Sequence, residues 1–347
     1  MEALGTGGSE SMRAAAAGKW LGASGLFMGP LIGLVLLLLV LCATTPAFLS
    51  LANALNVIDQ ITINGIMALG MTLVIIIGGI DLSVASLLVL AMMIFGVLTR
   101  DLQTSYPLAV ACGILAAAFC GLINGLLIVK AKVPAFIATM AMMSLARGAA
   151  NLVSGNTQRY GFADWFGNLS TVRYMGFLSM TTLLFLALTV IFGTFLAFRS
   201  TGKRLYAIGG NAEVARLAGV RVSLLSISVY CVSGLLAGLA GIVLNSRLLS
   251  SQPYGAQGYE LNVIAAVVIG GASLNGGVGS ITGTFIGTLI IGVLRNGLNL
   301  HGMNTFFQDV VIGAVIAITV AIDMLKRQRM ATAVKAEPAA AGPGREA

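Results

Sequence analysis

The sequence predicts an all-α polytopic membrane protein with about ten transmembrane helices. Of its 347 residues, 58% are hydrophobic and only 9% are charged, whereas about a quarter of a soluble globular chain is charged. Long apolar runs recur along the chain, and most basic residues lie in the breaks between them. The formal net charge of +8 therefore indicates membrane topology, and nucleic acid is not an expected partner.

A transmembrane helix needs about 20 apolar residues, and ten segments approach that length. The first follows basic residues but is longer than a cleaved signal sequence, so we expect it to be retained as a span. The eighth is too short to cross alone unless its neighbours extend it. Residues 46–60 are expected to form an interfacial helix. The predicted spans are 26–45, 61–79, 82–99, 107–129, 133–153, 176–198, 222–245, 261–271, 281–299 and 304–324.

The distribution of positive charge predicts the orientation of these spans. With ten of them, fourteen of the twenty Lys and Arg residues lie on the side that holds both termini, and four lie opposite. Loops rich in Lys and Arg stay in the cytoplasm. We therefore expect a membrane domain over 26–325 between cytoplasmic tails at 1–25 and 326–347. The chain from about Met330, rich in Ala, Pro and Gly, is expected to be unstructured.

The longest strongly basic break between two apolar runs is 199–221. Within it, Asn211 can cap a short helix, because its side-chain oxygen can accept an N–H of the first turn. Glu213 suits the positive end of the helix dipole, and Gly219 can end the helix in the left-handed conformation. A helix of about two turns needs a surface to pack against. The alternative is an ordinary basic loop at the lipid surface.

No motif supports catalysis. The fragment 200–204 lacks the upstream Gly and the following Ser or Thr of a phosphate-binding loop, and there is no HExxH, GxSxG or carboxylate pair within a span. His301 is the only histidine, and the four cysteines form no CxxC pair, so no metal site is predicted. We expect a non-catalytic chain, energised by an ion gradient or by another subunit.

Polar residues within or beside the spans allow two interpretations each. Asp81 can cap the helix that it precedes or serve as a proton or ion site. Arg147 and Arg295 can pair or snorkel, or they can contact a solute or gate. The asparagines can join helices or hydrogen-bond a neutral hydroxylated solute. The candidate pathway or gate residues are Asn64, Asp81, Ser83, Asn124, Asn262, Asn275, Arg295, Asn296 and Asn299.

A glycine-rich break, residues 271–283, follows the short eighth segment. Broken helices at membrane depth occur where the backbone lines a cavity or is buried in protein. Gly279, Gly283 and Gly287 form two overlapping GxxxG steps, a spacing that lets helices approach closely. The break therefore indicates backbone that is buried in protein or lines a cavity, and it does so more strongly than the glycine spacing alone.

Several stretches together resemble one family. In chain order they are GIDLSVAS (79–86), NGLLIVKAKVPAFIATMAMMSLARG (124–148), TGKRLYAIGGNAEVARLAGV (201–220), GLLAGLAGI (234–242), the run 258–300 and VAID (320–323). They resemble the membrane permease subunit of bacterial ATP-binding-cassette sugar importers, most closely the ribose or monosaccharide type. The likeness covers nearly all of residues 50–324.

The resemblance implies a ten-span fold like that of the vitamin B12 importer, a type II permease, in the bacterial inner membrane. It implies three partners: a second permease copy, cytoplasmic ATPase subunits that hold ATP and Mg²⁺, and a periplasmic sugar-binding protein. The last would dock around 159–173 and 247–260. The chain itself would bind no cofactor. The family's ATPase-coupling segment matches Gly209, Gly210, Asn211, Glu213, Ala215, Arg216 and Gly219.

Two other functions stay open at this point. One is an ion-coupled secondary transporter of a small neutral solute, using Asp81, Asp309, Arg147 or Arg295. The other is an export channel or membrane scaffold without energy coupling. Dependence of transport on ATP rather than on an ion gradient separates the importer from both.

Overall fold

The computed structural model describes residues 28–174 and 176–336, with side chains described as far as residue 321. The chain divides into two compact units, Met1–Met303 and Asn304–Ala347. The helices of the first unit are Met28–Thr44, the 3-10 helix η1 (Pro46–Leu49), α2 (Leu51–Ile76), α3 (Val84–Arg100), α4 (Tyr106–Val129), α5 (Ala135–Ser154), α6 (Asp164–Thr171), α7 (Met180–Phe198), α8 (Ser200–Gly210), α9 (Ala212–Leu217), α10 (Val222–Leu248), α11 (Tyr259–Ile269) and α12 (Ile281–Leu300).

Among the described helices, six are long and apolar enough to cross a membrane: α2, α4, α5, α7, α10 and α12. Shorter apolar helices occupy Met28–Thr44, α3, α11 and Thr305–Ala321. Every predicted span overlaps one of these apolar helices, and the eighth corresponds to the short α11. The chain is therefore a mostly helical, polytopic membrane protein.

The prediction for residues 46–60 was wrong. After η1 the chain enters α2 at Leu51, and this helix runs unbroken to Ile76. The polar side chains of Asn53 and Asp59 interrupt the apolar pattern, so the predicted span began at residue 61 instead of at Leu51. Both have partners inside the protein, because Asn53 exchanges two hydrogen bonds with Asn296 and Asp59 forms an ion pair with a loop arginine.

The inner helices of the first unit are α2 and α10, which are mostly buried, whereas only a minority of the residues in α4, α5 and α7 is buried. The backbones of α4 and α10 touch. A Cβ added at Gly121 would lie 2.3 Å from the carbonyl oxygen of Tyr230, and one at Gly234 would lie 2.4 Å from that of Ala117. Small residues permit this approach, which provides van der Waals contact where lipid supplies no hydrophobic drive.

The helices α11 and α12 approach each other closely, as the GxxxG spacing indicated. A Cβ at Gly283 would lie 2.0 Å from the Gly270 carbonyl oxygen, and one at Gly287 would lie 1.9 Å from that of Ala266. Residues 270–280, the α11–α12 loop, form the predicted break. Its tight turns explain its composition, since Gly276 has φ of +85°.

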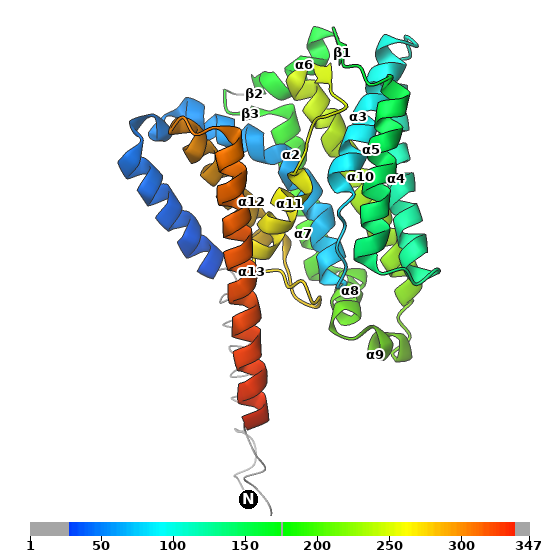
Figure 1. The fold of residues 1–347 in the computed structure, drawn as a ribbon, viewed down its shortest axis with the longest axis vertical. Helices are drawn as coiled ribbons and strands as arrows, with labels where there is room; N and C mark the ends of the chain where they lie inside the picture. Colours follow the sequence, from blue (N-terminus) through cyan, green and yellow to red (C-terminus); the bar gives the residue numbers. More distant parts are fainter. Residues whose placement is uncertain (1–27, 175, 337–347) are drawn as a thin grey trace, which may run out of the picture. The chain divides into compact units, whose positions relative to one another are not determined.

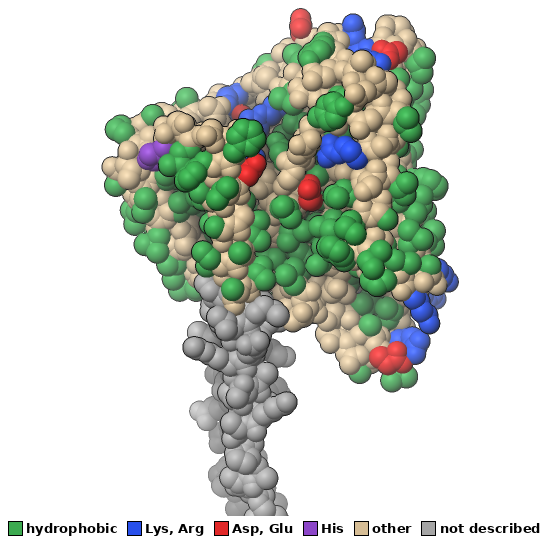
Figure 2. Space-filling model, viewed as in Figure 1, with side chains coloured by type: hydrophobic (Ala, Val, Ile, Leu, Met, Phe, Trp, Pro, Cys, Tyr) green, Lys and Arg blue, Asp and Glu red, His purple; other side chains and the backbone are tan. Residues whose placement is uncertain are grey.

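Short helices and strands lie at the two ends of the first unit (Figure 1). One, here called the α9 end, carries α8 and α9. The other, the α6 end, carries α6 and two antiparallel pairs of short strands. Figure 2 shows charged side chains gathered at both ends, with a largely hydrophobic surface and a few charges between them. The strand pairs are β1 (Arg159–Tyr160) with β4 (Ser250–Ser251) and β2 (Arg173–Tyr174) with β3 (Leu178–Ser179).

The second unit contains α13 (Thr305–Ala336). This helix continues past the end of the predicted last span at 324. The expectation of an unstructured chain from Met330 is therefore wrong for residues 330–336. The expected tail at 1–25 and the end of the chain after 336 lie outside the described residues.

Candidate functional site

Residues 199–221 form two helices rather than one. The Asn211 side-chain oxygen accepts the N–H groups of Glu213 and Val214, each at 3.0 Å, and so caps α9. Gly219, with φ of +81°, follows α9 in the left-handed conformation. The predicted cap and stop are both confirmed. The preceding helix α8 was missed, because its polar sequence ends in two glycines, and glycine disfavours helix by about 1 kcal/mol.

The short helix α9 presents a mixed surface at the end of the bundle. Ala215 packs inward and is 4% exposed, whereas Val214 is 60% exposed and Leu217 is 81% exposed. Glu213 and Arg216, one turn apart, form an exposed ion pair on the same helix. Exposed apolar side chains and a charge pair thus lie together on one short helix.

Backbone contacts hold the end of α8, the helix that leads into α9. A Cβ at Gly209 would lie 1.8 Å from the Ile76 carbonyl oxygen and 2.3 Å from the Gly277 nitrogen, so no larger residue fits. The Gly277 N–H donates to the same Ile76 carbonyl at 2.8 Å. These contacts, here called the glycine junction, join α8 to the end of α2 and to the α11–α12 loop.

Tyr206 adds a side-chain bond to the glycine junction. Its hydroxyl donates to the Gly279 carbonyl oxygen at 2.8 Å. Burial raises the pKa of Tyr206 above its ordinary value, so the hydroxyl stays protonated and remains a donor at neutral pH. The neighbouring Gly210, in contrast, is exposed, and a Cβ there would meet nothing within 4 Å.

Three of the predicted pathway residues meet in one buried cluster. Asp81 accepts hydrogen bonds from the Ser83 N–H at 3.0 Å, the Ser83 hydroxyl at 2.6 Å and the Ser233 hydroxyl at 2.9 Å. The Asn124 amide donates to the Ser83 hydroxyl at 3.0 Å. Each of the four is at most 1% exposed. The cluster joins the start of α3 to α4 and α10, and Asp81 supports the N-cap residue of α3 rather than capping that helix directly.

The other predicted pathway residues are not gathered in one place. Asn296 forms the reciprocal amide pair with Asn53 at 2.8 and 3.0 Å, which joins α12 to α2. The Asn64 side-chain oxygen is buried without a hydrogen-bond partner among the described residues. Their pathway role stays a prediction. Asn262 is buried on α11, Asn275 is exposed in the α11–α12 loop, and Arg295 and Asn299 lie on α12.

At the α6 end the structure reveals a hub that the sequence did not disclose, at Asp59. Its carboxylate accepts from Arg173 Nη2 at 2.9 Å, the Ser179 hydroxyl at 3.2 Å and the Thr182 hydroxyl at 3.0 Å. Its backbone carbonyl accepts from Arg247 Nη1 at 2.9 Å. The hub ties α2 to the β2–β3 pair, α7 and α10. The sequence contains one signal for this hub. Asp59 is a single carboxylate in an otherwise apolar stretch, and the loops expected outside the cell contain arginines that could pair with it.

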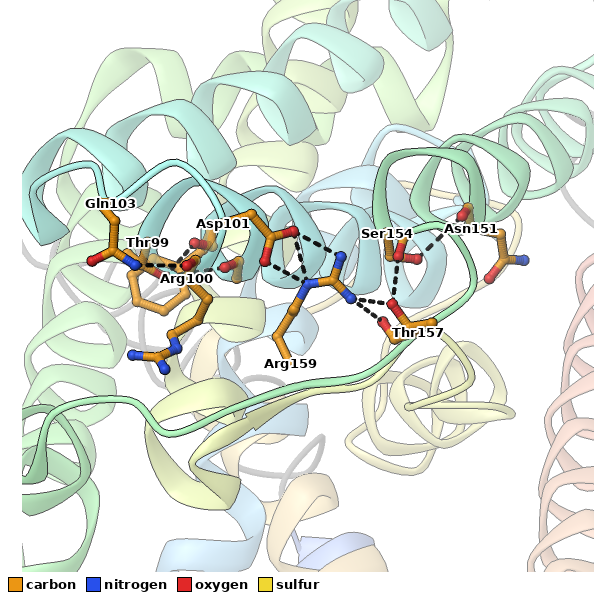
Figure 3. A network of polar contacts seen from close by, with 10 residues as sticks. Thr99, Arg100, Asp101, Gln103, Asn151, Ser154, Thr157 and Arg159 are labelled. Carbon is orange, nitrogen blue, oxygen red and sulfur yellow. Dashed lines mark hydrogen bonds and ion pairs between the residues drawn. The ribbon is translucent and has the colours of Figure 1, made fainter.

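A second ion pair orders the loop that follows α5 (Figure 3). Arg159 Nε donates to both carboxylate oxygens of Asp101 at 2.9 Å, and its Nη2 donates to Oδ2 at 2.7 Å. The hydroxyl of Thr157 donates to the Ser154 carbonyl at 2.8 Å. β1 then pairs with β4, so the two loops predicted to meet a binding protein lie side by side.

Comparison with known proteins identifies the relatives of this fold. Residues 53–320 match the model of the family described as "Branched-chain amino acid transport system / permease component". The chain is 42% identical over 306 residues to the ribose import permease protein RbsC of Bacillus subtilis (strain 168), covering 86% of this chain and 93% of that protein. Identity is 41% over 303 residues to the protein of the same name in Escherichia coli (strain K12), with the same coverage.

A relative named for a different sugar is also similar. The L-arabinose ABC transporter permease protein AraH of Azospirillum brasilense is 35% identical over 304 residues, covering 86% of this chain and 88% of that protein. No solved structure matches this chain.

Proposed function

This chain belongs to the family described as "Branched-chain amino acid transport system / permease component", and we propose that it is the membrane-spanning permease subunit of an ATP-binding-cassette importer for a monosaccharide of the ribose type. The sugar class rests on relatives whose names specify ribose or L-arabinose and which align over most of this chain. In this proposal a periplasmic binding protein delivers the sugar. Separate ATPase subunits hold ATP and Mg²⁺, and this chain carries neither cofactor nor catalytic residue.

The observation that carries the mechanism is the glycine junction beside the capped helix α9. The short helix α9, of mixed surface, projects from the bundle, and backbone-to-backbone contacts connect the preceding helix α8 to α2 and to the α11–α12 loop. Contacts between backbone atoms transmit displacement directly, because no side chain lies between them that could absorb the movement by changing rotamer. An ATPase that moves α9 would therefore move the end of α2, as a two-state transporter requires.

The remaining parts of the arrangement follow from the same proposal. The apolar helices form ten spans in a fold like that of the vitamin B12 importer. The α9 end and both termini face the cytoplasm, because most Lys and Arg residues lie on that side of the predicted topology. The α6 end faces the periplasm and receives the binding protein. A second copy of the chain pairs with the first, and α4, α5 and α7 supply outward surface for it and for lipid.

An ion-coupled transporter is the weaker candidate. Among the side chains that the structure describes, Asp81 is the one fully buried carboxylate. Its oxygens are held by three short donors inside a helix interface, which suits a structural role better than reversible ion binding. The family and the relatives favour the importer.

The test is uptake in sealed vesicles that contain the chain with its ATPase and binding protein. Uptake of D-ribose should need ATP and persist with an uncoupler. Exchanging the α9 charges, Glu213→Arg with Arg216→Glu, keeps an intrahelical pair but inverts the charges that the ATPase meets. Uptake should fall at least tenfold while membrane insertion is unchanged. Lys203→Glu on the exposed face of α8 is the matched control.

Two results would overturn the proposal. One is uptake that follows an ion gradient and ignores ATP. The other is normal ATP-driven uptake in the α9 charge-exchange variant, because a partner surface that tolerates inverted charges is not one that α9 engages.

A further inference from the structure

One face of α5 is polar although the helix is apolar enough to span the membrane. Ser144, Arg147 and Asn151 follow at i, i+3 and i+7, which places them on the same side of the helix. Ser144 is exposed and Arg147 is half-buried. An arginine at the centre of a span costs at least about 2.5–3.5 kcal/mol against lipid. Hydrocarbon is therefore a poor neighbour for this face.

Arg147 is held by backbone rather than by a carboxylate. Its Nη1 donates to the Gly255 carbonyl at 2.9 Å and to the Pro253 carbonyl at 3.3 Å. Among the described residues, no hydrogen bond engages its other nitrogens. The guanidinium thus keeps donors that can bind a ligand.

The chain that meets Arg147 is irregular, and it lies below the end of the helix. Arg147 precedes the last residue of α5, Ser154, by seven positions, which is about 10 Å along the axis. The Arg147 side chain covers part of this height, but the Ser251 hydroxyl, directly before the segment, donates to the Met92 carbonyl at 3.0 Å, eight residues before the end of α3. Residues 252–258 therefore lie below the helix ends without helical hydrogen bonding. Non-helical backbone at membrane depth is tolerated only inside protein or beside a water-filled cavity. Tyr254 is 55% exposed and Gln257 is exposed, so this segment is not enclosed by its own chain.

A carboxylate completes the arrangement. Glu260, half-buried in the first turn of α11, directly follows the irregular segment and interacts electrostatically with Arg147. The two are not in ion-pair contact, and the ion pairs of the described residues lie elsewhere. The cation and the anion are thus near enough to interact electrostatically but are not paired with each other.

We propose that Arg147, Glu260 and the carbonyls of residues 253–255 form a contact site for sugar hydroxyls on the translocation path. This proposal rests on the function proposed above and adds the site and its chemistry. A hydroxyl both donates and accepts, so a guanidinium and a carboxylate side by side can engage neighbouring hydroxyls of one sugar. Because the pair has no net charge, it favours a neutral polyhydroxylated solute over a charged one.

The location is tested by thiol labelling of the assembled transporter. The four native cysteines, Cys42, Cys112, Cys120 and Cys231, are first replaced by alanine. Ser144→Cys and Met140→Cys lie on the Arg147 side of α5. The controls Leu145→Cys and Leu152→Cys lie roughly 140–160° away around the helix and are 66% and 84% exposed. A membrane-impermeant, charged methanethiosulfonate should label the first two at least tenfold faster. Equal rates on both faces would overturn the assignment, because the polar face would then meet no water.

The chemistry is tested by sugar discrimination. Uptake of D-ribose and of 2-deoxy-D-ribose is measured with the binding protein saturated by each, for wild type, Arg147→Gln and Glu260→Gln. The variants should lose at least fivefold of the preference for D-ribose, whatever their overall rate of uptake. An unchanged preference would overturn the contact role, and a merely structural role would lower both rates without changing their ratio.

The two experiments separate this proposal from the function on which it rests. Labelling needs no sugar, so a labelled α5 face with no ATP-driven D-ribose uptake in wild type would refute the sugar importer and keep the water-filled path. Normal uptake with an unlabelled face would refute the site and keep the importer.

Discussion

The glycine junction makes a quantitative prediction for Gly209→Ala. The new Cβ would lie 1.8 Å from the Ile76 carbonyl oxygen, roughly 1.5 Å closer than van der Waals contact allows. Both neighbours are backbone atoms, so relief requires α8 to move away from α2 and from Gly277. Overpacking of this kind costs about 1–3 kcal/mol. Loss of the Gly277–Ile76 hydrogen bond adds about 1 kcal/mol.

The adjacent position supplies a matched control. Gly210→Ala adds the same methyl group where nothing lies within 4 Å, and in a helix alanine is favoured over glycine by about 1 kcal/mol. Each variant is assembled with its ATPase and binding protein, and D-ribose uptake and ATP hydrolysis are measured together. Gly209→Ala should lower uptake at least tenfold while ATP hydrolysis continues, and Gly210→Ala should transport normally.

Two results would contradict this prediction. If Gly209→Ala transports at the wild-type rate with an unchanged melting temperature, the close contact does not connect α9 to the membrane helices. If both glycine variants fail equally, the effect belongs to the flexibility of the segment rather than to the contact.

Three further predictions follow from single contacts. Asn211→Ala removes the acceptor for two N–H groups of α9, costs about 1 kcal/mol and should speed amide hydrogen exchange over 212–217, whereas unchanged exchange would refute the cap's role. Asp59→Asn breaks the partly exposed ion pair with Arg173, worth about 1 kcal/mol after solvent screening, and should lower the melting temperature by a few degrees; an unchanged value would mean that the hub adds no stability. Asp81→Asn should retain most uptake, because an amide can still accept from Ser83 while the Ser233 hydroxyl reverses, whereas Asp81→Leu leaves buried donors unpaired at about 1–3 kcal/mol each and should reduce folded protein. Loss of transport in well-folded Asp81→Asn would instead support ion coupling.

Local chemistry made the α9 region predictable from the sequence. Asn211 and Gly219 act within their own turn, so their roles can be inferred without the tertiary fold. The start of α2 could not be inferred in this way. Asn53 and Asp59 look like polar interruptions until their partners, 243 and 114 residues away in the chain, are known. Helix propensity and hydropathy depend on a residue's neighbours in sequence, so they cannot identify hydrogen-bond partners more than a hundred residues away in the chain.

Partners that are distant in sequence also explain why the role of Arg147 could not be predicted from the sequence. The sequence brought attention to Arg147 because it is a charge within a span, but it could not choose between snorkelling and solute contact. The choice depends on which segment meets the guanidinium, and a non-helical loop from beyond α10 does so. Asp81, Ser83 and Asn124 were predicted as candidate pathway or gate residues. Their common burial favours the helix-joining interpretation over an open gate.

One helix connects the two ends of the first unit. α2 carries Asp59, the hub of the α6 end, and its last residue, Ile76, accepts the hydrogen bond of the glycine junction. The two positions are seventeen residues apart, or about 25 Å along one unbroken helix. A helix clamped at both ends cannot shift at one end alone without breaking one of these contacts. Displacement of α9 must therefore either open the glycine junction or carry α2 against the β2–β3 pair and α7. Because the junction is backbone against backbone, and the hub consists of side chains that can change rotamer, we expect the hub to be the contact that breaks.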